Sequence, residues 1–328
     1  MKPINRRTLL GAAALLGLAT PWLLRQTVNG GEETLPEPFV WQGIALGSGA
    51  ELRLYHADRQ TAAQAVKAAL AEVERLEKLF SLYRDDSLIV RLNREGRLKN
   101  PPADFLTLLS LSSEIHRLSE GAFDPTIQPL WQFYSSWFQK NPQQPPPERA
   151  LAEAAAKVGL QHVFFDENEI RFAKHGMALS FNGIAQGYIT DRICALLQSR
   201  GIDTALADLG EIRAIGNHTW QAGIRKPKTD EILLNVPLRN QALATSGGYG
   251  TVLDESGRYT HLFDPASGKS TPLYQSISVM ANSAARADAL STALAVSPPE
   301  RLRRIVQKTG GLQVWMVGNN GEIEHLQS

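Results

Sequence analysis

Short strand-like segments come in neighbouring pairs along this chain, whereas the helix-like segments stand apart from them. Strand patterns occur at residues 39–46 and 51–56, joined by the Gly-Ser-Gly of 47–49, and again at residues 162–165 and 169–172. Paired strands with short connections form antiparallel hairpins. We therefore expect an α+β fold with mixed or antiparallel sheets and packed helices.

The helix-like segments have apolar residues at every third or fourth position, which places those residues on one face. This spacing predicts helices at residues 61–80, 104–119 and 183–200. Residues 141–147, NPQQPPP, predict a proline-rich loop. Shorter segments complete the prediction: a helix at 148–158, strands at 205–206, 212–215, 220–224, 232–236, 261–263 and 276–280, helices at 285–296 and 299–308, and a closing hairpin at 312–317 and 323–326.

Composition excludes several classes of protein. The 328 residues are 43% hydrophobic and 20% charged, which excludes a disordered chain and a protein with many membrane spans. The net charge is +1 and no long run of Lys or Arg occurs, so we expect no nucleic-acid partner. The single cysteine, Cys194, excludes an internal disulfide and a cysteine-rich metal site.

Residues 1–30 have the pattern of an export signal. They contain four basic residues and no acidic one, and residues 9–24 form a short apolar run. A basic region before such a run is typical of a secretory signal, and Arg6 and Arg7 before Thr-Leu-Leu resemble a twin-arginine signal. The alternative is an uncleaved membrane anchor formed by residues 9–24. Both interpretations place the body, residues 31–328, in the periplasm.

Residues 180–188, SFNGIAQGY, contain one glycine just before a predicted helix and another within its first turn. The first amides of a helix lack partners inside it, and the helix dipole attracts anions. Gly183 and Gly187 would therefore let the backbone approach a phosphate closely. The alternative is that the glycines only begin the helix.

Asp288 and Thr292 are four residues apart in the predicted helix 285–296, so they share one of its faces. A carboxylate and a hydroxyl are oxygen ligands that suit Mg²⁺, which fills its remaining positions with water and phosphate. The alternative is an exposed aspartate beside a threonine that bonds back to the helix. The apolar neighbours of both residues favour a buried helix, in which a carboxylate needs a partner.

Two Asp-Pro pairs lie in segments rich in glycine and small polar residues. Residues 261–268, HLFDPASG, place His261 three residues before Asp264, so this carboxylate could orient the histidine as a base. Residues 121–126, GAFDPT, place Asp124 before a proline. In both segments the alternative is an ordinary turn.

The order of these segments is more specific than any one of them. GAFDPT, NGIAQGY-x-x-D-R, LGEIRA, ATSGGY, HLFDPASG and ADALSTAL follow one another in this chain. Together they resemble the flavin transferases known as ApbE, the FAD:protein FMN transferases. The resemblance covers about residues 39–317 and includes YRDDSLIVRLN at residues 83–93. It implies an ApbE-like, T-fold-like architecture for residues 31–328.

The resemblance also implies an activity and the residues for it. Proteins of this family bind FAD and Mg²⁺, transfer FMN to a Thr or Ser hydroxyl of a partner protein, and release AMP. Tyr83 would lie on the isoalloxazine ring, and His261 would act as a base on the incoming hydroxyl. The other FAD-binding positions are Ala122, Phe123, Asp124, Ser180 and Gln186, and the metal ligands are Asp288, Thr292 and the carbonyl of Gly183.

Two positions depart from the family pattern. Ser180 stands where the family usually has Asp, and Gln186 stands where it usually has Lys. One acid and one base are missing together, so the local net charge is unchanged. LGEIRA, at residues 209–214, is also one glycine shorter than the usual form. Ser180 and Gln186 bear on how the pyrophosphate is neutralised, whereas we interpret the shorter LGEIRA as a subfamily trait.

Three functions follow as hypotheses. The first is an exported, Mg²⁺-dependent transferase that attaches FMN to a Thr or Ser of an envelope electron-transfer protein. The second is a flavin-binding or FAD-hydrolysing relative, which would release FMN and AMP without modifying a protein. The third is an envelope binding protein without enzymatic activity. The sequence does not identify the acceptor.

Overall fold

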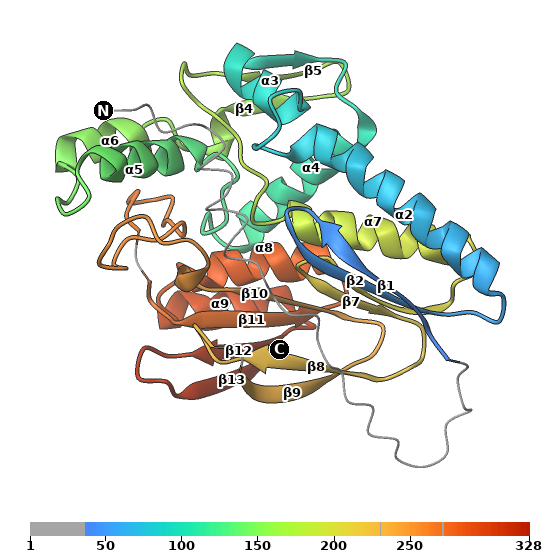
Figure 1. Cartoon of the computed structure of the whole chain (residues 1–328). Helices are drawn as coiled ribbons and strands as arrows, with labels where there is room; N and C mark the ends of the chain where they lie inside the picture. Colours follow the sequence, from blue (N-terminus) through green and yellow to red (C-terminus); the bar gives the residue numbers. More distant parts are fainter. Residues whose placement is uncertain (1–36, 230, 271) are drawn as a thin grey trace, which may run out of the picture.

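The computed structural model describes residues 37–229, 231–270 and 272–328; the predicted export segment, residues 1–30, lies outside them. The centre of the molecule is an antiparallel sheet with the strand order β1-β2-β6-β7-β10-β11-β12-β13 (Figure 1). Its strands are β1 (Phe39–Ala45), β2 (Ser48–Tyr55), β6 (Thr204–Asp208), β7 (Ile212–Ile215), β10 (Ala242–Ser246), β11 (Ser276–Ala281), β12 (Gln313–Val317) and β13 (Ile323–Gln327). The predicted α+β class with antiparallel sheets is confirmed.

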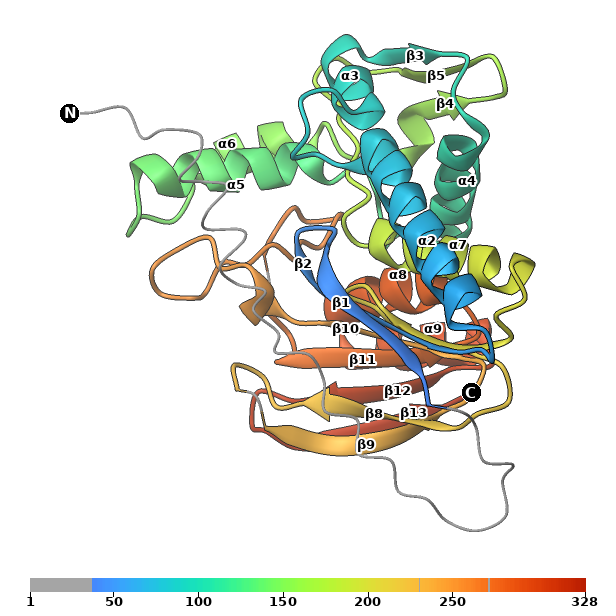
Figure 2. The same ribbon diagram turned by 45° about the vertical axis from the view of Figure 1, so that its right-hand side comes forward.

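Helices cover one face of this sheet (Figure 2). They are α2 (Arg59–Phe80), α7 (Ala185–Ser199), α8 (Ala284–Ala295) and α9 (Pro299–Thr309), with α4 (Ala103–Leu118) packed outside α8 and α9. Strand β10 turns Ala242 and Ala244 towards the helices, and these small side chains let α8 lie close to the sheet. A Cβ on Gly187 would lie 2.3 Å from the backbone oxygen of Ala284, so the close crossing of α7 and α8 requires this glycine.

The other face of the sheet is covered by a separate hairpin of β8 (Trp220–Arg225) and β9 (Ile232–Leu238). Successive side chains of a strand point to opposite faces of the sheet. Every second residue of these strands therefore points into the core between the large sheet and the hairpin. Leu243, Met280 and Trp315 are the members from the sheet, and Trp220 is one from the hairpin.

Two smaller units complete the fold. The first contains α3 (Leu88–Glu95), η1 (Leu160–His162) and the sheet β3-β5-β4, with β3 (Arg97–Lys99), β4 (Val163–Phe165) and β5 (Glu169–Phe172). The second, which we call the aromatic module, contains α5 (Gln128–Lys140), α6 (Glu148–Ala155) and residues 253–263, which follow η2 (Gly248–Gly250). Tyr134, Phe138 and Phe263 form the centre of its separate core.

The structure confirms most of the predicted elements and corrects one of them. The hairpins at 39–56, 162–172 and 312–326 are present as predicted. The strand predicted at 261–263 is wrong, because these residues form only isolated contacts on either side of the Asp264-Pro265 turn. Among the described residues, no helix is both long enough and apolar enough to span a membrane.

Candidate active site

A cleft with an empty volume of about 1160 Å³, counting the solvent at its mouth, lies at the end of β10, beside the first residues of α7. Seven separate stretches of the sequence line it, and residues of the aromatic module are among them. All ten predicted site residues are among its lining residues: Tyr83, Ala122, Phe123, Asp124, Ser180, Gly183, Gln186, His261, Asp288 and Thr292.

Helix α8 carries two of the three predicted metal ligands, Asp288 and Thr292, into the cleft. Asp191 of α7 fixes the start of α8, since its carboxylate accepts hydrogen bonds from the Ser283 hydroxyl (2.8 Å) and from the amides of Ala284 (2.9 Å) and Ala285 (3.0 Å). One turn further along the helix, Asp288 is 4% exposed and accepts a hydrogen bond from the Gly187 amide (3.1 Å). The interpretation of Asp288 as a solvent-exposed residue is therefore wrong.

Gly183 and Thr292 meet at the same corner of the cleft. A Cβ on Gly183 would lie 2.9 Å from the Thr292 Oγ1, so a side chain at this position would displace the threonine hydroxyl. Ser246 of β10 lies on the other side of Thr292, and the two hydroxyl oxygens are 3.3 Å apart. The corner thus brings together the three predicted metal ligands and one further hydroxyl.

Glu211 is a site residue that the sequence analysis missed. It directly precedes strand β7 and is 8% exposed in the cleft wall. Burial and the neighbouring carboxylates of Asp288 and Asp208 raise the pKa of Glu211 well above its usual value. Burial also raises the pKa of Asp288 to about 7. An acidic residue at the start of an apolar strand was the signal that could have identified Glu211.

The donors at this corner fit a hard divalent cation. The described residues contain no cluster of three or more His, Cys, Asp and Glu side chains that could hold a metal. Mg²⁺ commonly uses only one or two protein carboxylates, and here Asp288, the Thr292 hydroxyl and the Gly183 carbonyl are available. Of the described residues that line the cleft, none is Lys or Arg, whereas Asp124, Glu211 and Asp288 are acidic. A pyrophosphate in this cleft would therefore need a cation from solution.

Ser180 and Gln186, the two departures from the family pattern, flank this corner. The Ser180 amide donates to the Pro125 carbonyl (2.7 Å), and its hydroxyl accepts from the Asn182 amide (3.3 Å). The amide group of Gln186 lies over Gly210, where a Cβ would be 2.6 Å from its Nε2. Gly210 has a φ of +103°, which favours glycine, and a side chain there would also clash with Gln186. The turn before Glu211 therefore requires a glycine for two reasons.

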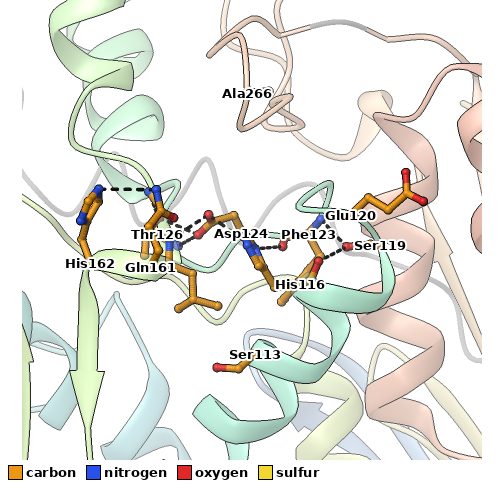
Figure 3. A network of polar contacts seen from close by, with 12 residues as sticks. Ser113, His116, Ser119, Glu120, Phe123, Asp124, Thr126, Gln161, His162 and Ala266 are labelled. Carbon is orange, nitrogen blue, oxygen red and sulfur yellow. Dashed lines mark hydrogen bonds and ion pairs between the residues drawn. The ribbon is translucent and has the colours of Figure 1, made fainter.

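The loop of residues 119–126 forms one wall of the cleft, and its polar groups are held from within (Figure 3). The Asp124 carboxylate accepts from the Thr126 amide (2.8 Å), the Thr126 hydroxyl (2.6 Å) and the Leu160 amide (3.1 Å). The His116 Nδ1 lies 2.8 Å from the Phe123 carbonyl. Asp124 therefore lines the cleft while its carboxylate holds the loop, which leaves the loop backbone, Ala122 and Phe123 to face a ligand.

Tyr83 lies at the mouth of the cleft. Its side chain is 60% exposed, and its hydroxyl accepts a hydrogen bond from the Asn182 Nδ2 (3.2 Å). This bond ties the ring to the segment that precedes α7. An exposed aromatic ring held at its polar end can stack on a planar ligand without rearrangement.

His261 faces the cleft from the segment opposite Thr251. The His261 Nδ1 lies 3.2 Å from the Thr251 carbonyl, and the His261 amide donates to the same oxygen (3.1 Å). A hydrogen on Nδ1 satisfies this carbonyl and leaves Nε2 as the nitrogen that can accept a proton. Burial lowers the pKa of His261, which keeps the ring neutral at neutral pH. Asp264 instead accepts bonds from its own turn, so it does not orient His261.

Fold and cleft together define an α+β protein with a cleft lined by acidic, hydroxyl-bearing and aromatic side chains. The chain belongs to the ApbE family, whose model matches residues 46–316. It is 29% identical over 254 residues to an FAD:protein FMN transferase of Haemophilus influenzae. The aligned region covers 72% of this chain and 73% of that protein. The resemblance found in the sequence is thereby confirmed.

Two solved structures have the same fold. The flavinyl transferase ApbE of Pseudomonas stutzeri in its apo form has a TM-score of 0.77 and 26% identity, covering 90% of this chain and 97% of the other. The ApbE protein of Thermotoga maritima has a TM-score of 0.79 and 26% identity, covering 88% and 96%.

Proposed function

We propose that this protein transfers FMN from FAD to a Thr or Ser hydroxyl of another protein, releases AMP and requires Mg²⁺. The single observation that carries the proposal is that all ten residues implied by the resemblance line one cleft. The relatives that bear the name FAD:protein FMN transferase support the activity. The cleft also has the mixed polar and aromatic lining that suits a flavin nucleotide.

Each part of the cleft has a role in this reaction. Tyr83 stacks on the isoalloxazine ring, and the loop containing Ala122 and Phe123 bounds the flavin. Asp288, Thr292 and the Gly183 carbonyl would hold Mg²⁺, which when bound neutralises charge on the pyrophosphate oxygens. The acceptor oxygen forms a bond to the phosphorus of the FMN half, and AMP leaves with the bridging oxygen and its electron pair.

His261 takes the proton from the acceptor hydroxyl in this scheme. Its Nδ1 is committed to the Thr251 carbonyl, so Nε2 receives the proton. Because burial lowers the pKa of His261, the imidazole is unprotonated and ready to act as a base at neutral pH. The protonated ring then returns the proton to solvent.

The place of action and the kind of acceptor are part of the proposal. The basic and apolar pattern of residues 1–30 supports export, by the twin-arginine route or with residues 9–24 as a membrane anchor. An exported flavin transferase would act in the periplasm, and its acceptor would be an envelope electron-transfer protein with a Thr or Ser at the flavinylation site.

A second candidate function is hydrolysis of FAD to FMN and AMP. Ser180 and Gln186 favour it, because both are uncharged and no Lys or Arg lines the described cleft. Incubation with FAD, Mg²⁺ and a Thr-bearing acceptor domain separates the two functions. Covalent flavin on the acceptor, with one AMP for each flavin, supports transfer. AMP and free FMN with an unmodified acceptor would instead establish hydrolysis.

A further inference from the structure

Five Ser and Thr side chains line the cleft, and four of them have partners. The Thr245 Oγ1 lies 2.8 Å from the Ser278 hydroxyl, and the Ser246 Oγ lies 2.7 Å from the Ser291 hydroxyl. Thr292 contacts Ser246 at the metal corner, and Ser180 accepts from the Asn182 amide. These bonds hold each of the four hydroxyls within the protein.

Thr251 is the fifth, and its hydroxyl differs from the others. Within the described part of the chain, no hydrogen bond is made by the Thr251 hydroxyl. The residue is half-buried and has an extended backbone, with a φ of −147° and a ψ of 114°. Its hydroxyl is therefore available to a ligand in the cleft.

The backbone places Thr251 directly opposite His261. Val252 and Thr260 form an antiparallel bridge, and the next pair along it is Thr251 with His261, whose amide donates to the Thr251 carbonyl (3.1 Å). Side chains of directly opposite residues lie on the same side, with Cβ atoms about 4.5–5.5 Å apart. Both residues line the cleft, and Gly250 leaves space beside the imidazole, since a Cβ there would lie 3.4 Å from the His261 Cε1.

We propose that Thr251 is an internal acceptor, to which the protein transfers FMN when no partner protein is present. This inference rests on the proposed function. The Thr251 Oγ1 forms a bond to the phosphorus of the FMN half of FAD, and the bond from that phosphorus to the bridging oxygen breaks. AMP leaves with that oxygen and its electron pair, and the hydroxyl proton passes to the His261 Nε2.

A tethered hydroxyl has an advantage over one in solution. Its position beside the base removes the need for a second molecule to bind in the correct orientation. The attached FMN would remain in the cleft and exclude a second FAD. The modification is therefore limited to one per chain, and a bound acceptor protein competes with it by displacing Thr251 from the phosphorus.

The test is mass spectrometry of the purified full chain after incubation with FAD and Mg²⁺, without acceptor. We expect one adduct of FMN less water, located on Thr251 by peptide sequencing. Thr251→Ala should lose the adduct, and Thr251→Ser should keep it, because serine retains the hydroxyl. Thr245→Ala is the matched control and should keep it, since this hydroxyl lines the same cleft but is bonded to Ser278.

A parallel reaction with a Thr-bearing acceptor domain separates this inference from the proposed function. If the acceptor domain carries flavin but the enzyme is unmodified both with and without the acceptor, the internal acceptor is refuted and the proposed function stands. An adduct on Ser246, or one that persists in Thr251→Ala, would also overturn it. The absence of flavin from both proteins would overturn the proposed function and the inference together.

Discussion

Replacing Asp288 by asparagine should stabilise the metal-free protein at alkaline pH while removing its response to Mg²⁺. Asp288 is 4% exposed, and burial raises the pKa of its carboxyl from 3.8 to about 7. Asparagine has nearly the same size and keeps an acceptor for the Gly187 amide, but it carries no charge. In the absence of the cation, the ionised Asp288 carboxylate should therefore reduce the stability of the protein.

The magnitude follows from the pKa difference. One pKa unit corresponds to about 1.36 kcal/mol, so ionisation of Asp288 disfavours the folded state by about 4 kcal/mol. Because the pKa of Asp288 is higher in the folded state, its contribution to stability is complete below about pH 3.8 and is lost as the pH rises through about 7. The variant should exceed the parent in free energy of unfolding by almost nothing at about pH 3 and by about 4 kcal/mol at about pH 8.

The assay is urea denaturation of both proteins in EDTA across this pH range, repeated with excess Mg²⁺. Mg²⁺ should stabilise only the parent, because a ligand that binds the folded state alone stabilises it. The control is Asp191→Asn on the neighbouring helix α7. It weakens the bonds that Asp191 makes to Ser283, Ala284 and Ala285 at the start of α8 and should destabilise the protein by about 1 kcal/mol at neutral pH. A folded Asp288→Asn protein no more stable than the parent at about pH 8 would refute the reasoning.

Further predictions concern flavin binding, export and the two family departures. Tyr83→Ala should weaken FAD binding by about 1–3 kcal/mol in fluorescence titrations and affect turnover at saturation less, since the ring stacks but does no chemistry. Replacement of Arg6 and Arg7 by Lys should leave precursor in the cytoplasm in cell fractionation if the twin-arginine route is used; unchanged accumulation outside would indicate the general secretory route. Ser180→Asp alone should lower FAD affinity and Gln186→Lys alone should raise it, with the double variant near the parent and a coupling of ~0.5–3 kcal/mol in a double-mutant cycle. Strict additivity would mean that the two positions act separately.

The sequence predicted which residues come together in the cleft more completely than it predicted the elements that carry them. Asp288 and Thr292 could be paired because helical spacing alone places them on one face. Glu211 was missed because its proximity to Asp288 depends on strand β7 lying beside β10 under α8, and no local pattern encodes that arrangement. Strand β10, ALATS, also escaped prediction, since its small residues have low strand propensity and its two neighbours decide its conformation.

The aromatic module shows a different limit. Helix α5 begins at Gln128 with Pro129 in its first turn, which is a common start signal, but its aromatic residues are spread around the helix. Tyr134 and Phe138 are buried in the module, while Trp131 lines the cleft. A helix that serves a core and a cleft at once does not show the single apolar stripe used to predict it.

Transfer of FMN from FAD to an acceptor protein is the central claim, and one measurement tests it most directly. The full chain is incubated with FAD, Mg²⁺ and a Thr-bearing acceptor domain, and the acceptor is then denatured and examined for covalent flavin while AMP is counted. We predict one FMN on the acceptor for each AMP, and loss of both in EDTA, in Asp288→Asn and in His261→Ala. AMP release with an acceptor that carries no covalent flavin would contradict the account.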